Sequence, residues 1–211
     1  MDTISILKQT YGCGVPILLK DIRIGGKSKT SIRQELSRAV KKGEIIRKWN
    51  GVYCFKKENS YVTGVTFEDI LSKKYIRGER GTLAYDLDIY GYYTGYMLIN
   101  WLGISPQVPA VPQITTNKTS CNREIKKGNR RALIYKSKVE INFQNYRALQ
   151  LFDMFYWLSD AEYQENKEKL VKYFFDICTI KDFDYLKYFR GQNLMNFYKE
   201  CMDYEISRQQ K

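Results

Sequence analysis

Apolar residues recur at helical spacing from the start of the chain. Residues 4–11 form a first short stretch of this kind, and Gly12 follows it as a stop. A second short helix is expected to begin at Val15-Pro16, because proline is tolerated in the first turn of a helix, and it would turn its apolar side chains inward. Gly25-Gly26 then predicts a break of the kind that joins two helices at a steep angle.

The next helix has the clearest signals in the chain and is expected over residues 29–42. Ser28 stands where an N-cap is preferred, and Gly43 stands just past the last turn, where glycine ends helices. Between them, apolar residues recur at spacings of three and four, at Ile32, Leu36, Ala39 and Val40. This stripe predicts one buried face and one polar face.

A β-hairpin is expected directly after this helix. Residues 44–48 and 52–56 are compatible with strands, and they flank Trp49-Asn50-Gly51, in which Asn-Gly is the strongest short hairpin signal. Three helices followed by a tight hairpin is the order of a winged helix-turn-helix. We therefore predict a winged helix DNA-binding domain over residues 1–60.

Residues 61–211 are predicted to form a second domain, mixed in structure to about residue 145 and helical over 146–211. Thr66 can cap a short helix, and Glu68 and Asp69 favour its N-terminus because they are acidic. The aromatic residues of the helical tail are expected to form a core, with a partner-binding face as the alternative. The fold class is therefore α+β. Beyond residue 80, helices are expected over 96–102, 146–159, 167–178 and 193–208, and strands over 113–116, 132–135 and 139–143.

Positive charge is concentrated near the start of the chain. Residues 1–57 hold 13 Lys and Arg against four Asp and Glu, whereas residues 58–211 hold 22 against 19. The whole chain has a formal net charge of +12. Such an asymmetry indicates a basic module that meets a polyanion, joined to a nearly neutral module with another task.

Composition excludes several kinds of chemistry. The chain has no histidine, so Ser-His-Asp catalysis, Cys-His catalysis and His-ligated metals are excluded. Its five cysteines are widely spaced and form no Cys-x-x-Cys pair, which is typical of reduced thiols packed as small hydrophobes. No apolar run reaches the roughly 18 residues of a membrane helix, and the first residues lack a basic leader. We therefore expect a cytoplasmic protein without a membrane partner.

The polar face of the helix over residues 29–42 carries side chains that suit DNA recognition. Arg can fork onto guanine and Gln onto adenine, while Ser, Thr and Lys reach bases or phosphates. The hairpin adds basic residues placed for a flanking phosphate or the minor groove. The alternative is a solvated face on a winged helix that is used for protein contacts. The predicted DNA contacts are Ser28, Lys29, Thr30, Arg33, Gln34, Ser37, Arg38, Lys41, Lys42, Arg47, Lys48 and Asn50.

Two parts of the chain resemble a known family. Residues 28–53, and 36–45 in particular, look like the N-terminal winged helix of abortive-infection antitoxins of the AbiEi type, which belong to type IV toxin–antitoxin pairs. Short segments at 93–95, 102–104, 107–109 and 115–117 are similar to the start of that family's C-terminal domain. The resemblance covers about residues 1–145, and the helical tail matches the family pattern poorly.

This resemblance implies a function in phage defence. The winged helix is expected to bind the operator of its own operon, as double-stranded DNA, and to repress transcription. The C-terminal domain is expected to oppose a cognate toxin of nucleotidyltransferase type, with or without direct contact. The resemblance carries over no catalytic residue, cofactor or metal, so the chain is expected not to be an enzyme. The antitoxin region is assigned to Tyr93, Lys126, Lys127, Arg130 and Arg131.

Other functions stay open at this point. A solitary winged-helix regulator would use the same DNA-binding residues. A metal-dependent nucleic-acid enzyme could hold magnesium with Asp86 and Asp88, whose spacing places both on one face of a strand. The basic stretch over residues 123–138 could bind RNA, with Tyr135 stacking on a base, could dock an acidic toxin surface, or could be a solvated loop.

Overall fold

The fold consists of two units, Met1–Lys74 and Tyr75–Lys211, and each packs helices on short strands. The computed structural model describes residues 2–57, 64–79 and 87–210. Within these ranges, none of the helices combines the length and the hydrophobicity that a membrane span requires. The class is α+β, as predicted.

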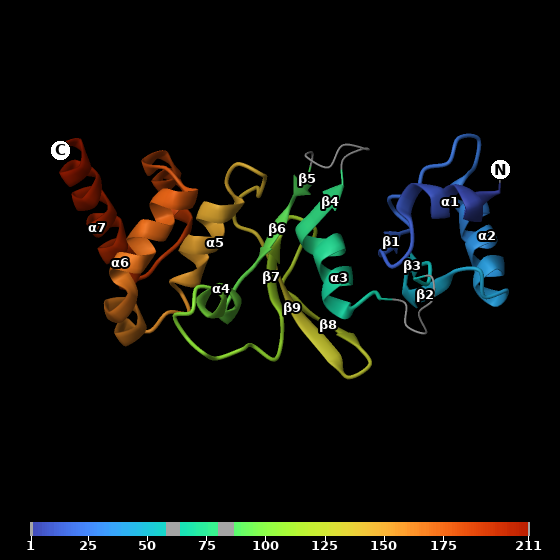
Figure 1. Cartoon of the computed structure of the whole chain (residues 1–211), viewed down its shortest axis with the longest axis horizontal. Helices are drawn as coiled ribbons and strands as arrows, with labels where there is room; N and C mark the ends of the chain where they lie inside the picture. The colour runs from blue at the N-terminus through green and yellow to red at the C-terminus, as the bar shows by residue number, and fades with distance from the viewer. Residues whose placement is uncertain (1, 58–63, 80–86, 211) are drawn as a thin grey trace. The chain divides into compact units, whose positions relative to one another are not determined.

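The first unit builds a three-stranded antiparallel sheet from short segments that are far apart in the sequence. The strand order is β1-β3-β2, so β3 pairs with both of its neighbours. In chain order the elements are α1 (Thr3–Tyr11), β1 (Ile17–Leu18), α2 (Lys29–Lys41), β2 (Ile46–Trp49), β3 (Val52–Cys54) and α3 (Phe67–Leu71), as Figure 1 shows.

Local signals place both long helices of this unit and its hairpin where they were predicted. Asp2 caps α1, and Gly12 ends it with a positive φ of 70°. Ser28 caps α2 by accepting a hydrogen bond from the backbone N–H of Ser31. Gly43 follows α2 with a φ of 75°, a conformation that other residues adopt with strain.

The expected second helix after Val15-Pro16 is wrong. The chain forms the strand β1 there, and a turn over residues 19–21 follows it. Neighbouring residues of a strand point to opposite faces of the sheet. Ile17 packs in the cluster beneath α1 and α2, while Leu18 packs in the cluster beneath α3. On a helix the two side chains would point only about 100° apart, so burial on opposite faces favours the strand.

The sheet of the first unit is covered on both faces. α1 and α2 pack on one face, where Leu7, Leu36 and Tyr53 are buried together. α3 packs on the other face, where Ile70 joins Val52. This packing explains why the first unit extends to Lys74, whereas the predicted boundary was at residue 60.

α3 begins where it was expected. The Thr66 hydroxyl accepts a hydrogen bond from the backbone N–H of Asp69, and the Asp69 carboxylate accepts one from the backbone N–H of Thr66. This reciprocal pair is a capping box, which satisfies two backbone donors at the start of the helix. A π-helical turn, Ser72–Ile76, then carries the chain into the second unit.

In the described part of the second unit, strands form a two-stranded and a four-stranded sheet. The larger sheet has the order β6-β7-β9-β8; β7 and β9 run parallel, and the other two pairs are antiparallel. The first residue of β6 is Gly91, where the close approach of the backbone requires glycine, because a side chain there would collide with the carbonyl oxygens of Tyr75 and Thr115. The strands are β4 (Arg77–Glu79), β5 (Leu87–Ile89), β6 (Gly91–Tyr93), β7 (Gln113–Thr116), β8 (Arg123–Lys127) and β9 (Arg130–Lys136).

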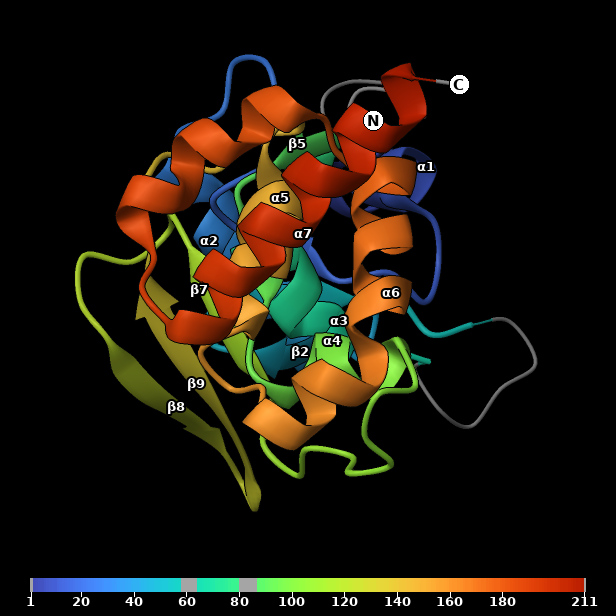
Figure 2. The same ribbon diagram turned by 90° about the vertical axis from the view of Figure 1, so that its left-hand side faces the viewer.

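The basic stretch after residue 122 is itself a hairpin. β8 and β9 pair in antiparallel register around Gly128, which has a φ of 57°, and they extend as a long ribbon (Figure 2). The predicted strand over 132–135 is part of β9, which pairs with β7 on one side and with β8 on the other. β8 lies at an edge of the sheet, where charged side chains are common because they prevent pairing with another chain. Because most residues of β8 are charged, its sequence lacks the alternation of apolar and polar residues that predicts a strand.

The strand predicted over residues 139–143 is wrong because a side chain engages the backbone there. Asn117 Nδ2 donates to the carbonyl oxygen of Ile141 at 2.8 Å, and the N–H of Ile141 donates to Asn117 Oδ1 at 3.1 Å. These are the two groups that a strand partner would have bonded. The segment therefore runs without regular structure into the helical tail.

Helices complete the second unit and confirm the four predicted ones. The predicted helix over 146–159 ends early, at Met154, and the one over 167–178 begins early, at Asp160. A 3₁₀ helix between the last two α-helices was not predicted. The helices are α4 (Tyr96–Trp101), α5 (Tyr146–Met154), α6 (Asp160–Ile177), the 3₁₀ helix η2 (Ile180–Tyr188) and α7 (Gln192–Gln209).

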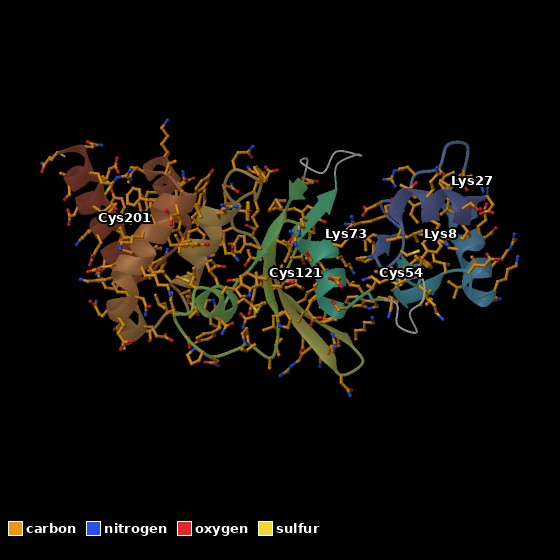
Figure 3. The ribbon with its side chains drawn as sticks, in the orientation of Figure 1. Lys8, Lys27, Cys54, Lys73, Cys121 and Cys201 are labelled. Atoms are coloured by element: carbon orange, nitrogen blue, oxygen red, sulfur yellow. The ribbon has the colours of Figure 1, made fainter. Side chains whose placement is uncertain are left out.

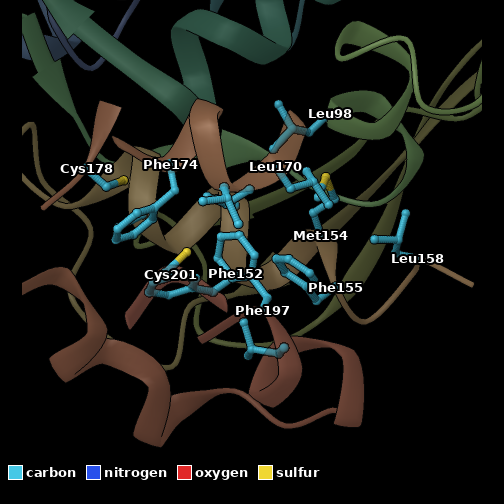
Figure 4. Packing of buried hydrophobic residues seen from close by; sticks show 14 of the residues in the cluster. Leu98, Phe152, Met154, Phe155, Leu158, Leu170, Phe174, Cys178, Phe197 and Cys201 are labelled. Carbon is cyan, nitrogen blue, oxygen red and sulfur yellow. The ribbon is translucent and has the colours of Figure 1, made fainter. Parts of the chain in front are cut away.

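Aromatic side chains of these helices form the core of the second unit, as predicted. Phe152, Phe155, Phe174 and Phe197 are at most 4% exposed and lie in one cluster (Figure 4). Close ring packing of this kind stabilises a core beyond the area that it buries. Tyr156, an aromatic residue of the predicted helix over 146–159, is 77% exposed, so the prediction of a core position is wrong for this residue.

Three cysteines are buried, as expected of small hydrophobes. Cys178 and Cys201 belong to the aromatic cluster, and burial raises the pKa of each thiol to about 12. Cys54 is buried in the first unit. For Cys121 the prediction is wrong, because this residue is exposed beside the β8–β9 hairpin (Figure 3).

Candidate nucleic-acid interface

α2 separates an apolar face from a polar one. Ile32, Leu36 and Ala39 are at most 2% exposed, whereas Val40 is only half-buried. The structure therefore presents one continuous polar surface along this helix. All the contact residues predicted within the helix are exposed on it: Lys29, Thr30, Arg33, Gln34, Ser37, Arg38 and Lys41.

The acidic residue of α2 is occupied away from this surface. Lys27 Nζ lies 2.7 Å from Glu35 Oε2 and also donates to Thr3 Oγ1 at 2.8 Å (Figure 3 labels Lys27). This hydrogen bond from Lys27 lowers the pKa of Glu35, so the carboxylate stays charged and paired. No described carboxylate forms an ion pair with Arg33 or Arg38. The positive charge of the polar face is therefore not neutralised within the described chain.

The start of α2 carries positive charge where a helix prefers negative charge. Backbone N–H groups give a helix N-terminus a partial positive charge, so acidic residues stabilise the first turn. α3 and α6 follow this rule with Glu68 and Asp69 and with Asp160 and Glu162. α2 instead begins with Lys29 and has no acidic residue in its first turn. This arrangement disfavours the helix by itself and favours an anion bound at its end.

The hairpin residues lie beside the start of α2 but are not all free. Arg47 is exposed, and its Nη2 donates to Asn50 Oδ1 at 2.8 Å. Lys48 is half-buried next to a β-bulge between Arg47 and Trp49. Gly51 has a φ of 68°, which the turn requires. At the far end of α2, Lys42 lies 3.9 Å from Glu44 and is partly neutralised.

A groove of about 330 Å³ connects the start of α2 with the hairpin turn. Its lining includes Lys29 and Arg33 from α2 and Asn50 and Gly51 from the turn, and it contains no acidic side chain. Two further lysines, Lys20 and Lys74, line the same groove. The structure thus brings four cations around one depression beside a helix N-terminus, which is an arrangement that suits a phosphate.

Comparison with known proteins gives no further guidance. No family model matches this chain, and no curated protein or solved structure does either. The function must therefore be inferred from the surfaces of the two units and from the resemblance in sequence.

Sequence reasoning missed two of the groove residues, Lys20 and Lys74. Lys20 belongs to the segment for which a helix was wrongly predicted after Pro16, and that helix was described only by its inward apolar side chains. Lys74 follows α3, and its Nζ lies 4.8 Å from the centre of the Trp49 ring. Such a cation–π contact fixes the lysine near the hairpin. No local signal could have shown this, because the two residues meet only through packing of α3 on the sheet.

The residues assigned to the antitoxin region do not form one site. Tyr93 ends β6, where its ring meets Trp101 edge to face at 5.5 Å. The predicted basic residues lie on β8 and β9. Since β6 and β8 are the opposite edges of the four-stranded sheet, the structure separates Tyr93 from the basic hairpin.

The basic hairpin is partly neutralised by its own glutamate. Glu124 lies 3.2 Å from Lys126 Nζ and 3.8 Å from an Arg131 guanidinium nitrogen. Lys127 and Arg130 stand directly opposite each other at the turn. Cations still outnumber the single acid of the hairpin, so its surface stays positive.

Only one of the two predicted magnesium ligands lies among the described residues. Asp86 lies outside the described residues, and Asp88 lies in β5. Among the residues that the structure describes, no group of three or more acidic or cysteine side chains could hold a metal ion.

Proposed function

We propose that this chain is a DNA-binding antitoxin, which represses its own operon and opposes a toxin of nucleotidyltransferase type. The DNA-binding half of this proposal is carried by the polar face of α2, whose exposed arginines form no ion pair with any described residue. A helix face that only contacts solvent does not require cations along its length, and a cation at the positively charged N-terminus of the helix is unfavourable there. Duplex DNA supplies the missing negative charge.

The first unit is proposed to act as a winged helix in which the turn over residues 19–21 takes the place of the middle helix. α2 would enter the major groove with its N-terminal residues toward base edges, as recognition helices do. Arg33 and Gln34 are the residues proposed to contact bases. Phosphates would lie in the cationic groove at Lys29, and the hairpin would reach the neighbouring backbone or the minor groove.

The antitoxin half rests on the resemblance over residues 93–117 and on the positive surface of the β8–β9 hairpin. An acidic toxin surface is the partner that this hairpin fits best, because long-range attraction steers oppositely charged proteins together. The alternative is a solitary winged-helix regulator, which would have the same DNA-binding face and no toxin to oppose.

Operator binding tests the first half of the proposal. The affinity of the full chain for the DNA upstream of its own gene is measured by fluorescence anisotropy across a range of salt concentrations. About six phosphate contacts would give a slope of log K against log salt near −5. We expect the double variant Arg33→Ala/Arg38→Ala to weaken binding and, because Arg33 is proposed to contact a base, to reduce the preference for the operator over unrelated DNA. If Arg38 meets a phosphate, its loss also reduces the salt slope by about 0.9, which alone weakens binding about fivefold near 0.15 M salt.

A matched control removes the same charge from elsewhere. Lys172 and Lys199 are exposed on α6 and α7, so Lys172→Ala/Lys199→Ala lowers the net charge equally and is expected to bind DNA like the unmodified protein. Equal loss in both double variants would mean that only net charge matters. Unchanged DNA binding in both double variants would overturn the proposal that α2 is the DNA-recognition helix.

Co-expression tests the second half. A neighbouring gene that encodes a nucleotidyltransferase-like toxin is expressed with and without this chain, from promoters that the chain does not control. Restored growth with the full chain, including its Arg33→Ala/Arg38→Ala form, is the expected result. Failure of rescue would favour the solitary regulator and would leave operator binding intact.

A further inference from the structure

A second cavity lies within the second unit, and nothing proposed so far uses it. It has a volume of about 450 Å³. It is bounded by residues of β6, β7, β9, α5 and η2, of the segments that follow β6, α5, β9 and η2, and of the segment before β8. A volume of this size accommodates a small organic ligand. Its walls change in character from a buried polar end, through aromatic rings, to an exposed cationic end.

The buried end is centred on the carboxylate of Asp153, from α5. Thr94 Oγ1 donates to Asp153 Oδ2 at 2.6 Å, and Thr115 Oγ1 donates to the same atom at 3.2 Å. The Tyr92 hydroxyl also interacts with this carboxylate, and burial raises the pKa of Tyr92, so the phenol keeps the proton that it donates. Tyr92, Thr94 and Thr115 are all buried.

A carboxylate in this position lowers the stability of the fold, because it loses part of its contact with water. Burial raises the pKa of Asp153, while the hydrogen bonds from Thr94 and Thr115 oppose that rise. No described cation forms an ion pair with Asp153, although Lys138 is near enough to favour its charge. A carboxylate has about four lone-pair positions, so three donors leave one position for a donor from a ligand.

Aromatic rings line the middle of the cavity. Tyr135, Trp157 and Tyr188 are half-buried there, and Tyr156 is 77% exposed at the same wall. Tyr156 and Trp157 meet edge to face, with ring centres 5.3 Å apart. Large aromatic groups left open to solvent beside a cavity suit a flat ring that stacks on them.

Cations line the exposed end. Lys136, Lys138 and Arg190 are all exposed, and Lys138 Nζ is placed by the carbonyl oxygen of Tyr188 at 3.4 Å. Apart from Asp153, the lining contains no acidic residue. The exposed end therefore attracts an anion, whereas the buried end accepts a hydrogen bond.

We infer that this cavity binds a free mononucleotide whose base carries an exocyclic amine. The amine donates to Asp153, the base stacks among the tyrosines, and the phosphate lies near Lys138 and Arg190. Simple polyanions would leave the aromatic wall unused and would face the carboxylate. Apolar ligands would displace water from the half-buried Asp153 carboxylate without offering a donor to its open position, which is unfavourable.

Titration with defined nucleotides tests this inference on the full chain. Binding of adenosine monophosphate, cytidine monophosphate, uridine monophosphate and adenosine is followed by calorimetry. We expect the two amine-bearing nucleotides to bind about tenfold more tightly than uridine monophosphate, which is the difference that one hydrogen bond supplies. Adenosine is expected to bind more weakly than its monophosphate, because it lacks the anion.

Variants assign the two ends of the cavity separately. Lys138→Gln/Arg190→Gln is expected to lower affinity for adenosine monophosphate to that of adenosine, whereas the exposed pair Lys172→Gln/Lys181→Gln, outside the lining, leaves it unchanged. Asp153→Asn keeps an acceptor for the threonines and is expected to abolish the preference over uridine monophosphate. Thermal unfolding verifies that each variant is folded.

Three results would overturn the inference. One is the absence of binding by every mononucleotide up to about 1 mM, a concentration above the dissociation constant expected of a specific site. Another is binding that neither set of variants changes. The third is binding of a short single-stranded oligoadenylate with no binding of the free nucleotide, since the site would then read nucleic acid and not a mononucleotide. Operator binding by α2 is measured independently, so neither proposal depends on the other.

Discussion

The substitution Lys29→Glu is expected to stabilise the protein and to weaken its binding to DNA. Lys29 occupies the first turn of α2, where the helix dipole repels a cation and attracts an anion. Removing the repulsion and adding the attraction are each worth about 0.3–0.5 kcal/mol for an exposed side chain. The new carboxylate also stands four residues before Arg33, a spacing at which the two can pair.

These contributions sum to about 1 kcal/mol, which raises the unfolding temperature of a domain as small as the first unit by about 4–8 °C. Lys29→Gln, the matched control, removes the repulsion without adding the attraction and is expected to give about half of that rise. Scanning calorimetry of the full chain measures both variants against the unmodified protein, in low salt where screening is weak.

DNA binding is expected to change in the opposite direction. If Lys29 contacts one phosphate, Lys29→Gln reduces the salt slope by about 0.9 and weakens binding about fivefold near 0.15 M salt. Lys29→Glu weakens it further, because its carboxylate repels the backbone and occupies Arg33. Should Lys29→Glu bind the operator as tightly as the unmodified chain, or lower the unfolding temperature, the argument that this helix end exists for an anion would be refuted.

Two further predictions concern the basic β8–β9 hairpin and the ion pair between Lys27 and Glu35. Glutamate replacements across the β8–β9 hairpin are expected to abolish toxin rescue but not operator binding; a loss of RNA retention on filters instead would favour an RNA-binding role. The positions are Lys126, Lys127, Arg130 and Arg131. Lys27 holds the pKa of Glu35 below its ordinary value of 4.5, so this pair contributes stability above that pH and loses it as the pH falls through the lowered pKa. The unfolding temperature is therefore expected to fall more steeply from about pH 5 to about pH 3 than in Glu35→Gln, and equal slopes would contradict the pairing.

Elements defined by neighbouring residues were predictable from the sequence. α2 has its cap at Ser28, its stop at Gly43 and its apolar stripe between them, and the structure has each where it was expected. The hairpin after it follows from Asn50-Gly51. The exposed face of α2 was predictable for the same reason, because the period of a helix fixes which side chains are left outside.

Elements defined by distant partners were not predictable. β1 has only two residues, and it exists because β3 pairs with it and because apolar clusters cover both sides of that pair. The edge strand β8 was hidden by its charges, and the strand expected over 139–143 was prevented by Asn117, which precedes it by more than 20 residues. Helical or alternating periodicity carries no information about such contacts.

The same distinction separates the two candidate sites. A nucleic-acid surface is exposed, so its chemistry can be read from the polar positions of one helix. The cavity around Asp153 depends on contacts that span 59 residues to Thr94 and 38 residues to Thr115. In the sequence, Asp153 is a charged residue at the edge of the apolar stripe of its helix, four residues after Leu149. Only the packing of α5 against β6 and β7 places that carboxylate inside, so a buried polar site of this kind becomes visible only when the strands that supply its hydroxyls are in place.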